Sequence, residues 1–182
     1  MATPTTLPST FTSGQILTAA QMNNLRGAFR ILQVVSTTKT DTFSVASTTY
    51  TDVTGLSVSI TPTSNTSKIL IMASVAQGQG TADVIATMQL VRDTTAICIG
   101  DAAGSRRRSS AAFYAIAAGG VTQLQQNSIV FLDSPATTSA TTYKIQVQAS
   151  TGTTYVNRTG ADTDNAAWPR TASTITVMEI SA

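Results

Sequence analysis

From residue 31 onward, apolar and polar positions alternate in short runs separated by turn residues. Residues 55–61 and 143–148 show this most clearly, because every second side chain is apolar. Their apolar faces are formed by Leu56, Val58, Ile60, Tyr143, Ile145 and Val147. A period of two is typical of a strand with one side in a core and the other in water. We therefore expect about nine or ten strands and, since no helix alternates with them, an all-β, antiparallel, jelly-roll-like sandwich.

Three further runs add detail to this sandwich. Residues 68–73, KILIMA, are apolar without alternation, which predicts a strand covered on both faces, at a subunit interface or inside the sandwich. Residues 83–91 and 95–99 flank Arg92, Asp93 and Thr94, and this spacing predicts a hairpin. Residues 49–54 are expected as a short strand before the separate strand at 55–61.

The first 30 residues follow a different pattern. Residues 1–16 are rich in Pro, Thr and Ser without periodicity, so we expect a flexible arm. Thr18 and Gln21 have the spacing of a capping box, which predicts that a helix begins there. Apolar side chains then follow at intervals of three and four, as in a short coiled-coil seam. The helix presents Leu17, Met22, Leu25, Phe29 and Leu32.

This helix is too short to be stable alone. Its apolar stripe packs either on the body of its own subunit or on copies of itself or another protein. The chain therefore divides into an arm and attachment helix at residues 1–30 and a β-sandwich head at residues 31–182.

The composition describes an unusual surface. Only 11% of the 182 residues are charged, whereas about 25% is usual for a soluble domain, so Thr, Ser, Gln and Asn must form the exterior. Low charge gives little protection against self-association, and we expect sister subunits to cover much of each copy. A net charge of +2 argues against nucleic acid as a partner. The chain has no apolar run of membrane-spanning length and no signal-peptide pattern, so we expect synthesis in a cytosol and no membrane insertion.

Candidate chemistry is scarce. Because the chain has no His, the usual catalytic triads and zinc sites are largely excluded, and we expect no enzyme activity and no cofactor. The single Cys98 cannot form an internal disulfide and is expected to be a small buried hydrophobe. Asp162, Asp164 and Asn165 could offer oxygen ligands to Ca²⁺, or could simply form Asx turns in a polar loop.

Two loops carry residues that could contact a surface ligand. Arg106, Arg107 and Arg108 form a solvated tip, an intersubunit ion-pair set or a contact for an anionic glycan. Trp168, with Tyr155 and Arg158 nearby in sequence, could form a carbohydrate platform or be buried against the edge of the sandwich. If both loops contact the same ligand, residues 100–110 and 158–170 should lie at one end of the molecule.

Several segments resemble proteins of tailed-bacteriophage virions. The opening SGQILTAAQMNNL resembles the short N-terminal segments by which fibre, spike and appendage proteins attach to the particle. The remainder looks like a β-rich domain of virion and tail-fibre-like or head-fibre-like proteins. The segments that carry this resemblance are LQVVSTTKTDTFS, YTDVTGLSVSITPTSNTSKILI, IGDAAGSR, FLDSPATTSATTYKIQVQ and TASTITVMEI.

The resemblance implies a structural, non-enzymatic protein of the virion surface. Its head would trimerise as a jelly roll, somewhat like heads of the tumour-necrosis-factor and complement families. Residues 1–30 would dock on other virion proteins of the capsid, tail or baseplate, and the exposed head would bind a host cell-surface glycan. A capsid decoration protein that stabilises the head is the alternative, and a glycan depolymerase is a minor one.

Overall fold

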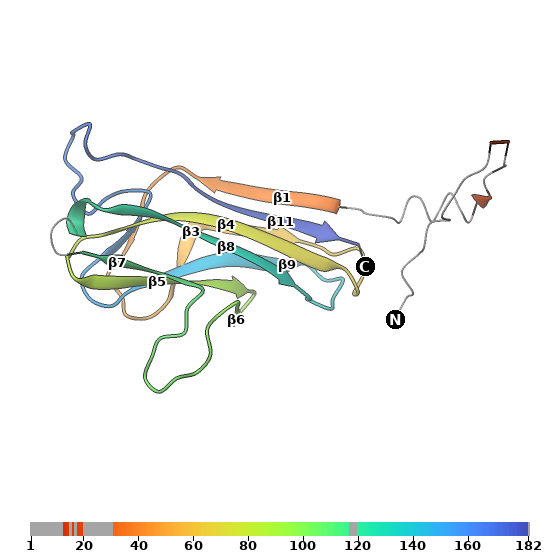
Figure 1. Cartoon of the computed structure of the whole chain (residues 1–182), viewed down its shortest axis with the longest axis horizontal. Coiled ribbons are helices and arrows are strands. Elements are labelled where there is room, and N and C mark those ends of the chain that lie inside the picture. The colour runs from red at the N-terminus through yellow and green to blue at the C-terminus, as the bar shows by residue number, and fades with distance from the viewer. Residues whose placement is uncertain (1–12, 15, 17, 20–30, 117–119, 182) are drawn as a thin grey trace.

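The computed structural model describes residues 13, 14, 16, 18, 19, 31–116 and 120–181 (Figure 1). These residues form eleven strands and one short 3-10 helix, η1, at Gly120–Thr122. The strands are β1 (Ile31–Lys39), β2 (Phe43–Val45), β3 (Thr51–Ile60), β4 (Lys68–Gln79), β5 (Val84–Arg92), β6 (Thr95–Ile97), β7 (Ala111–Ala115), β8 (Leu124–Asp133), β9 (Thr141–Ala149), β10 (Thr154–Val156) and β11 (Ser173–Ile180).

Two antiparallel sheets form the sandwich. Sheet A has the order β1-β11-β4-β10-β2, with β8 also paired to β4. Sheet B has the order β3-β9-β5-β6, with β7 also paired to β5. The eight longest strands pair from the outside of the chain inward: β1 with β11, β3 with β9, β4 with β8 and β5 with β7. This is the connectivity of a jelly roll, in which a long hairpin wraps into two facing sheets. The predicted all-β, antiparallel sandwich is confirmed.

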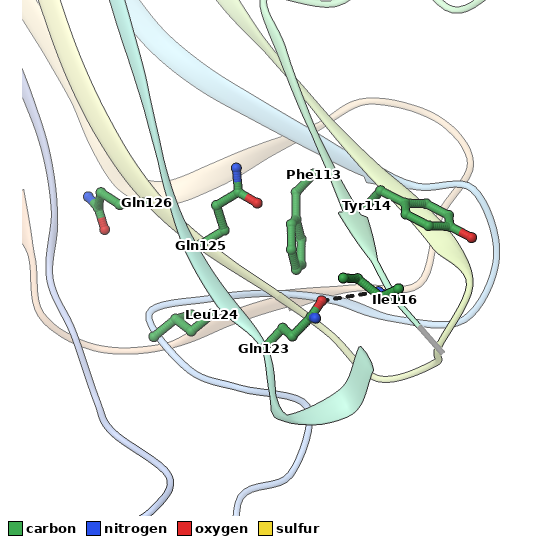
Figure 2. A pocket seen from close by; sticks show the side chains of 7 residues that line it. All are labelled: Phe113, Tyr114, Ile116, Gln123, Leu124, Gln125 and Gln126. Carbon is green, nitrogen blue, oxygen red and sulfur yellow. Dashed lines mark hydrogen bonds between the residues drawn. The ribbon is translucent and has the colours of Figure 1, made fainter. Parts of the chain in front are cut away.

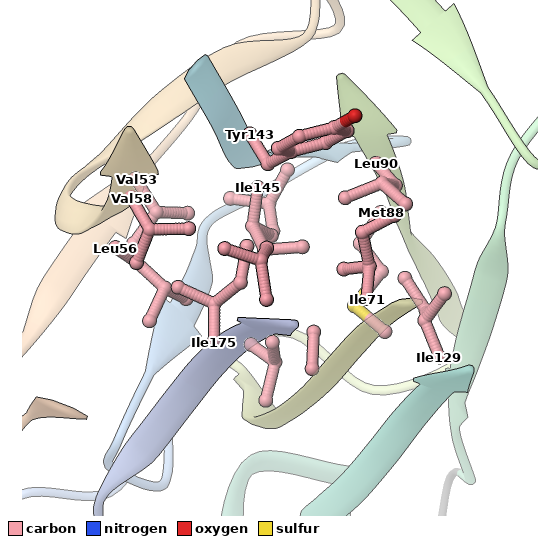
Figure 3. Packing of buried hydrophobic residues seen from close by; sticks show 14 of the residues in the cluster. Val53, Leu56, Val58, Ile71, Met88, Leu90, Ile129, Tyr143, Ile145 and Ile175 are labelled. Atoms are coloured by element: carbon pink, nitrogen blue, oxygen red, sulfur yellow. The ribbon is translucent and has the colours of Figure 1, made fainter. Parts of the chain in front are cut away.

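Apolar side chains from both sheets fill the space between them (Figure 3). The two alternating runs of the sequence supply the wall from sheet B, as the period of two predicts. Their inward side chains are all at most 4% exposed: Leu56, Val58, Ile60, Tyr143, Ile145 and Val147. Ile71 and Ile175 meet them from sheet A and are also fully buried. The half-buried Cys98 packs at the margin of this core.

The structure corrects four details of the sequence prediction. Leu32 lies in β1, at a register shift, because the chain is already paired with β11 at this point, and it is not part of a helix. Leu17, Met22, Leu25 and Phe29 lie outside the described residues. Residues 51–60 form one strand, β3, because a bulge at Gly55, with φ of 80°, absorbs the irregularity. The described residues form eleven strands where about nine or ten were expected, and three of them, β2, β6 and β10, are only three residues long.

The fourth correction concerns β4. Its inward residues Ile69 and Ile71 are fully buried, but Met72 on the other face is 36% exposed. Within one subunit the apolar run 68–73 is therefore covered on one face only, because sheet A is an outer layer of the sandwich. The predicted hairpin at residues 92–94 is confirmed as the turn between β5 and β6.

Two buried carboxylates are held by polar neighbours. The Arg92 guanidinium donates to both oxygens of Asp133 at 2.9 Å, and the Tyr143 hydroxyl donates to Asp133 Oδ2 at 2.7 Å. Glu179, at the other end of β11 from Ser173, accepts hydrogen bonds from the backbone N–H and hydroxyl of Thr63, both at 2.7 Å. Each carboxylate thus has the partners that a buried charge requires.

The sandwich has two distinct ends. Ile31 pairs with Ile180 at one end of sheet A, where residues 1–30 join the head. Lys39 pairs with Ser173 at the other end, where the connection from β10 enters β11 (Figure 1). At about 3.3 Å per residue, β1 separates these two ends by roughly 25 Å. No helix within the described residues is long and apolar enough to cross a membrane.

Candidate ligand-binding loop

Residues 157–172 form a long connection between β10 and β11, and Asn157 fixes where it begins. Its Nδ2 donates to the carbonyls of Lys39 at 2.8 Å and Asp41 at 2.9 Å. Its Oδ1 accepts a hydrogen bond from the Ser173 hydroxyl at 2.6 Å. Asn157 is fully buried and has φ of 65°, a conformation that Asn tolerates better than most residues. The two ends of the loop are therefore anchored to the same buried point of the sandwich.

Close backbone contacts hold the start of the loop against β4. A Cβ added at Gly160 would lie 2.1 Å from the carbonyl oxygen of Gln79, and one added at Gly78 would lie 2.3 Å from that of Arg158. Only glycine permits these approaches. The Ala161 N–H also donates to the Val121 carbonyl at 2.8 Å. This loop has the rigid support that a preorganised binding site needs.

An ion-pair cluster shapes the exposed part of the loop. The Arg158 guanidinium lies 4.0 Å from the centroid of the Tyr155 ring and donates to Asp162 Oδ2 at 2.6 Å. It also donates to the carbonyls of Thr159 and Gly160. Arg170 forms a second ion pair with Asp162, at 2.6 Å. Because two guanidinium groups hold both of its oxygens, Asp162 organises the loop.

This arrangement bears on the Ca²⁺ interpretation of the loop. Asp162 is engaged by arginine, and no group of three or more His, Cys, Asp or Glu with metal-ligand geometry occurs in the part of the chain that the structure describes. The alternative interpretation was a polar loop with Asx turns. Asn165 forms such a turn, because its Oδ1 accepts a hydrogen bond from the Ala167 N–H at 2.8 Å.

A groove of about 260 Å³ opens on this loop. Its lining residues are Asp162, Thr163, Asp164, Asn165, Trp168 and Arg170. The Trp168 indole is half-buried, and its Nε1–H donates to the Thr163 hydroxyl at 3.0 Å, so the ring has a fixed orientation. The Arg170 side chain is 55% exposed, and Asp164 has no hydrogen-bond partner among the described residues. An indole surface beside the half-exposed Arg170 guanidinium, which Asp162 engages on one side, and the unpaired Asp164 carboxylate suits a hydroxyl-rich ligand.

Tyr155 and Arg158 pack against each other, but neither lines the groove that Trp168 lines, and Asp162 is the link between them and it. The carbohydrate platform stays a prediction. Sequence reasoning did not assign Arg170, although it follows Trp168 by two residues, nor the role of Asp162 as the common partner of two arginines. The i, i+4 spacing of Arg158 and Asp162 was an available signal, but it identifies a pair only within a regular helix. Here the chain bends at Gly160, outside any helix, between the two paired side chains.

The arginine loop is separate from this site. Arg106, Arg107 and Arg108 are exposed, and the Arg108 Nε–H donates to the Gly100 carbonyl at 2.6 Å within the same loop. In Figure 1 the loop that follows β6 projects beneath sheet B, whereas the blue loop before β11 lies at an end of the sandwich. The expectation that both loops share one end is wrong, because β6 and β7 carry the arginine loop to the side of sheet B.

A second groove, of about 430 Å³, lies between β7 and β8, the strands where the two sheets part (Figure 2). Figure 2 shows Phe113 and Gln125 between the two strands, while Tyr114 projects from the other side of β7. Gln123 is already engaged, since its Oε1 accepts a hydrogen bond from the Ile116 N–H at 3.1 Å. None of the described residues that line this groove is charged, so they offer a ligand amide, phenol and apolar contacts.

No protein-family model matches this chain, and the curated proteins contain no significant match. Among solved structures, the chain is similar to the VP2 subviral particle of infectious bursal disease virus, with 13% identity and a TM-score of 0.36. That similarity covers 81% of this chain and 41% of the viral one. The structure of the Gx strain of the same virus gives 16% identity, a TM-score of 0.36 and coverage of 82% and 38%. The chain thus spans about two fifths of the length of these structures.

Proposed function

We propose that this chain is a non-enzymatic structural component of a phage virion, the head of a short trimeric fibre or spike. Residues 1–30 attach it to other virion proteins, and the sandwich is exposed on the particle. The observation that carries the proposal is the separation of the two ends. The attachment segment joins the sandwich at Ile31. The preorganised loop of residues 157–172, with its groove, leads into Ser173 at the opposite end. By fold analogy alone, jelly rolls serve as capsid and lectin domains.

The loop at residues 157–172 is the proposed contact with a host cell-surface glycan. Trp168 supplies a surface on which a sugar ring can stack, and Arg170 and Asp164 supply a donor and an acceptor for hydroxyl groups. The rest of the loop is already ordered by Asn157 and Arg158, so binding requires little additional ordering. The exposed arginines 106–108 are a separate surface, available to an anionic glycan or a neighbouring subunit.

Attachment is tested by comparing particles that carry the full chain with particles that carry residues 31–182, both labelled and viewed by electron microscopy. We expect the full chain at the tail or on the capsid and the shortened chain on neither, while circular dichroism shows that the shortened chain is folded. Normal occupancy by the shortened chain would refute attachment through residues 1–30.

The same particles distinguish the alternatives. If the chain is a capsid decoration protein, particles without it should lose heat resistance and still adsorb to cells. If it binds the host, particles without it should fail to adsorb and keep their heat resistance.

Glycan binding is tested with Trp168→Ala and, as a matched aromatic control, Tyr114→Ala, whose side chain is 51% exposed away from this loop. The probe is polysaccharide purified from the host cell surface. We expect Trp168→Ala to weaken binding about tenfold or more, as for an aromatic residue at the centre of a contact, and the control to bind normally. Equal binding by both variants would refute this site, and release of new reducing ends would support the depolymerase alternative.

A further inference from the structure

The outer face of sheet A carries apolar side chains in a row across four strands. Leu132 on β8 is directly opposite Leu70 on β4, Leu70 is opposite Met178 on β11, and Met178 is opposite Val34 on β1. Met72 and Val130 form a neighbouring pair. Among these side chains, Val130 is 69%, Val34 54% and Leu132 51% exposed.

This face is unusual for the outside of a sandwich. The solvent side of an antiparallel sheet normally carries polar residues, and a contiguous exposed apolar patch marks an interaction surface. In the sequence, the continuous apolar run at residues 68–73 predicts a strand covered on both faces, whereas one subunit covers only one of them. Something outside the described residues of one subunit is needed to cover the second face.

We propose that the outer face of sheet A is the surface through which copies of this chain associate. The proposal deepens the homotrimer of the proposed function and rests on it for the number of copies. Lys68, at a corner of the face, is the one charged side chain among its outward positions on these four described strands. A partner with a charged surface would lose hydration there without gaining an ion pair. A second uncharged face avoids this cost, and an identical chain provides one.

Several polar groups of this face are already hydrogen-bonded to one another. The Ser36 and Thr176 hydroxyls are 2.8 Å apart, and Gln126 Nε2 donates to the Ser74 hydroxyl at 2.7 Å. Lys68 Nζ donates to the Ser134 hydroxyl at 2.7 Å. Burial of these groups against another copy therefore leaves few donors or acceptors without a partner.

The shape of the face also suits a contact with itself. A shallow hollow of about 270 Å³ lies between β8, β4 and β11, and Met72, Ser74 and Ser128 are among its lining residues. The protruding Val130 stands at the rim of the same hollow. Because the projection and the depression are different parts of one face, Val130 of one copy can enter the hollow of the next, and such a head-to-tail contact can close into a trimer.

The size of the face indicates how strong this contact is. Four strands about 4.8 Å apart, each with about seven residues at about 3.3 Å, span roughly 450 Å² before side-chain relief is added. Stable interfaces bury about 800 Å² per partner, so this face alone gives a contact at the weak end of the range. We therefore expect association of the full chain to depend on protein concentration.

The test is sedimentation velocity of the full chain over a concentration series, with Val130→Glu and the matched control Ile116→Glu. Ile116 is 58% exposed and follows β7 of sheet B, where it lines the groove between β7 and β8 and is not on the outer face of sheet A. We expect the unchanged chain and the control to form oligomers, and Val130→Glu to raise the dissociation constant at least tenfold. Since Val130 is largely exposed, thermal unfolding of Val130→Glu should match that of the unchanged chain at concentrations low enough for both to be monomeric.

The proposal is overturned if the full chain is monomeric throughout, or if Val130→Glu associates as strongly as the control. Oligomers that persist in Val130→Glu but disappear when residues 1–30 are removed would place the contact in the N-terminal segment. That result refutes this surface and leaves the homotrimer of the proposed function intact. If Val130→Glu still sediments as a trimer, the homotrimer of the proposed function stands and the outer face of sheet A is refuted as its contact.

Discussion

Asn157 and Ser173, the residues at the two ends of the long loop, are joined by a hydrogen bond of 2.6 Å from the Ser173 hydroxyl to Asn157 Oδ1. The same hydroxyl accepts a hydrogen bond from the Ala76 N–H at 3.0 Å, which ties the pair to β4. The loop that carries the candidate groove is thus closed at its base by side chains inside the sandwich. Its conformation depends on the core as well as on its own sequence.

Replacement of Asn157 by Ala should destabilise the head and loosen this loop. The variant loses three side-chain hydrogen bonds and places Ala at a positive φ, so we expect a loss of about 2–4 kcal/mol in the free energy of unfolding, measured in urea. Trypsin should also cut faster at Arg158 and Arg170. Cleavage at the exposed arginines 106–108 should not change, and it serves as the internal standard.

The exposed Asn65 provides the matched control for this substitution. Asn65→Ala should stay within about 0.5 kcal/mol of the unchanged protein. If Asn157→Ala behaves like Asn65→Ala, the loop is not anchored through Asn157.

Gly160 should not tolerate any side chain. A Cβ there would lie 2.1 Å from the Gln79 carbonyl oxygen and 2.9 Å from the Gly80 Cα, and these backbone atoms cannot easily move. Gly160→Ala should therefore lower the free energy of unfolding by about 1–3 kcal/mol, measured by denaturant titration. Gly100→Ala, where a Cβ meets no atom within 4 Å, should be neutral or slightly stabilising. Equal stability of the two variants would contradict this packing.

Glu179 should make the head sensitive to acid. Burial alone would raise the pKa of Glu179, but hydrogen bonds from Gln33 and Thr63 outweigh it and lower the pKa from 4.5 to about 2. A carboxyl whose pKa is lowered on folding stabilises the folded state above pH 4.5. That contribution is lost as the pH falls from 4.5 towards 2.

Glu179→Gln isolates this effect, because the side chain keeps its size and loses its charge. We expect the variant to be less stable at pH 7 by about 1–3 kcal/mol. The Gln side chain has only one acceptor oxygen, so it cannot accept hydrogen bonds from both Gln33 and Thr63. The difference from the unchanged protein should shrink as the pH falls below 4.5. Urea unfolding at pH 7, 5 and 3 measures that difference, and a difference that is constant with pH would rule out Glu179 as its source.

Replacement of Asp133 should lower the free energy of unfolding more than replacement of the more exposed Asp52. Asp133→Ala leaves the Arg92 guanidinium and the Tyr143 hydroxyl without their buried partner, so we expect a cost of about 3 kcal/mol or more. Asp52 pairs with Lys144 at 2.8 Å near the surface, and Asp52→Ala should cost about 1 kcal/mol or less. Denaturant unfolding of both variants tests this order, and its reversal would contradict it.

The fold class could be predicted from local patterns. Residues 55–61 and 143–148 alternate because each strand has one face in the core, and Leu56, Val58 and Tyr143 are buried as that period requires. The turn residues at 92–94 likewise predict a hairpin, because the preference of such residues for a turn involves only their immediate neighbours in the sequence. The pattern could not show that β3 continues through Gly55, because a bulge depends on the partner strand β9.

The candidate site was predictable only in part. Trp168, Tyr155 and Arg158 stood out as aromatic and basic residues in a long loop, a feature of composition that sequence displays directly. The pairing of Arg158 and Arg170 with Asp162 lies in a loop held by Gly160 packing against Gln79, a contact between segments about 80 residues apart. The separation of the arginine loop from this site depends likewise on the path of β6 and β7 along sheet B.

The sequence by itself determined an all-β chain with little charge, no His and a strand apolar on both faces, because these properties follow from residue type and spacing. Only the tertiary structure decided which face of that strand is buried in its own subunit. Strand register aligns Val34, Met178, Leu70 and Leu132 in one row on the opposite face. Such a row arises from hydrogen bonds between segments distant in the chain, and no local pattern encodes it.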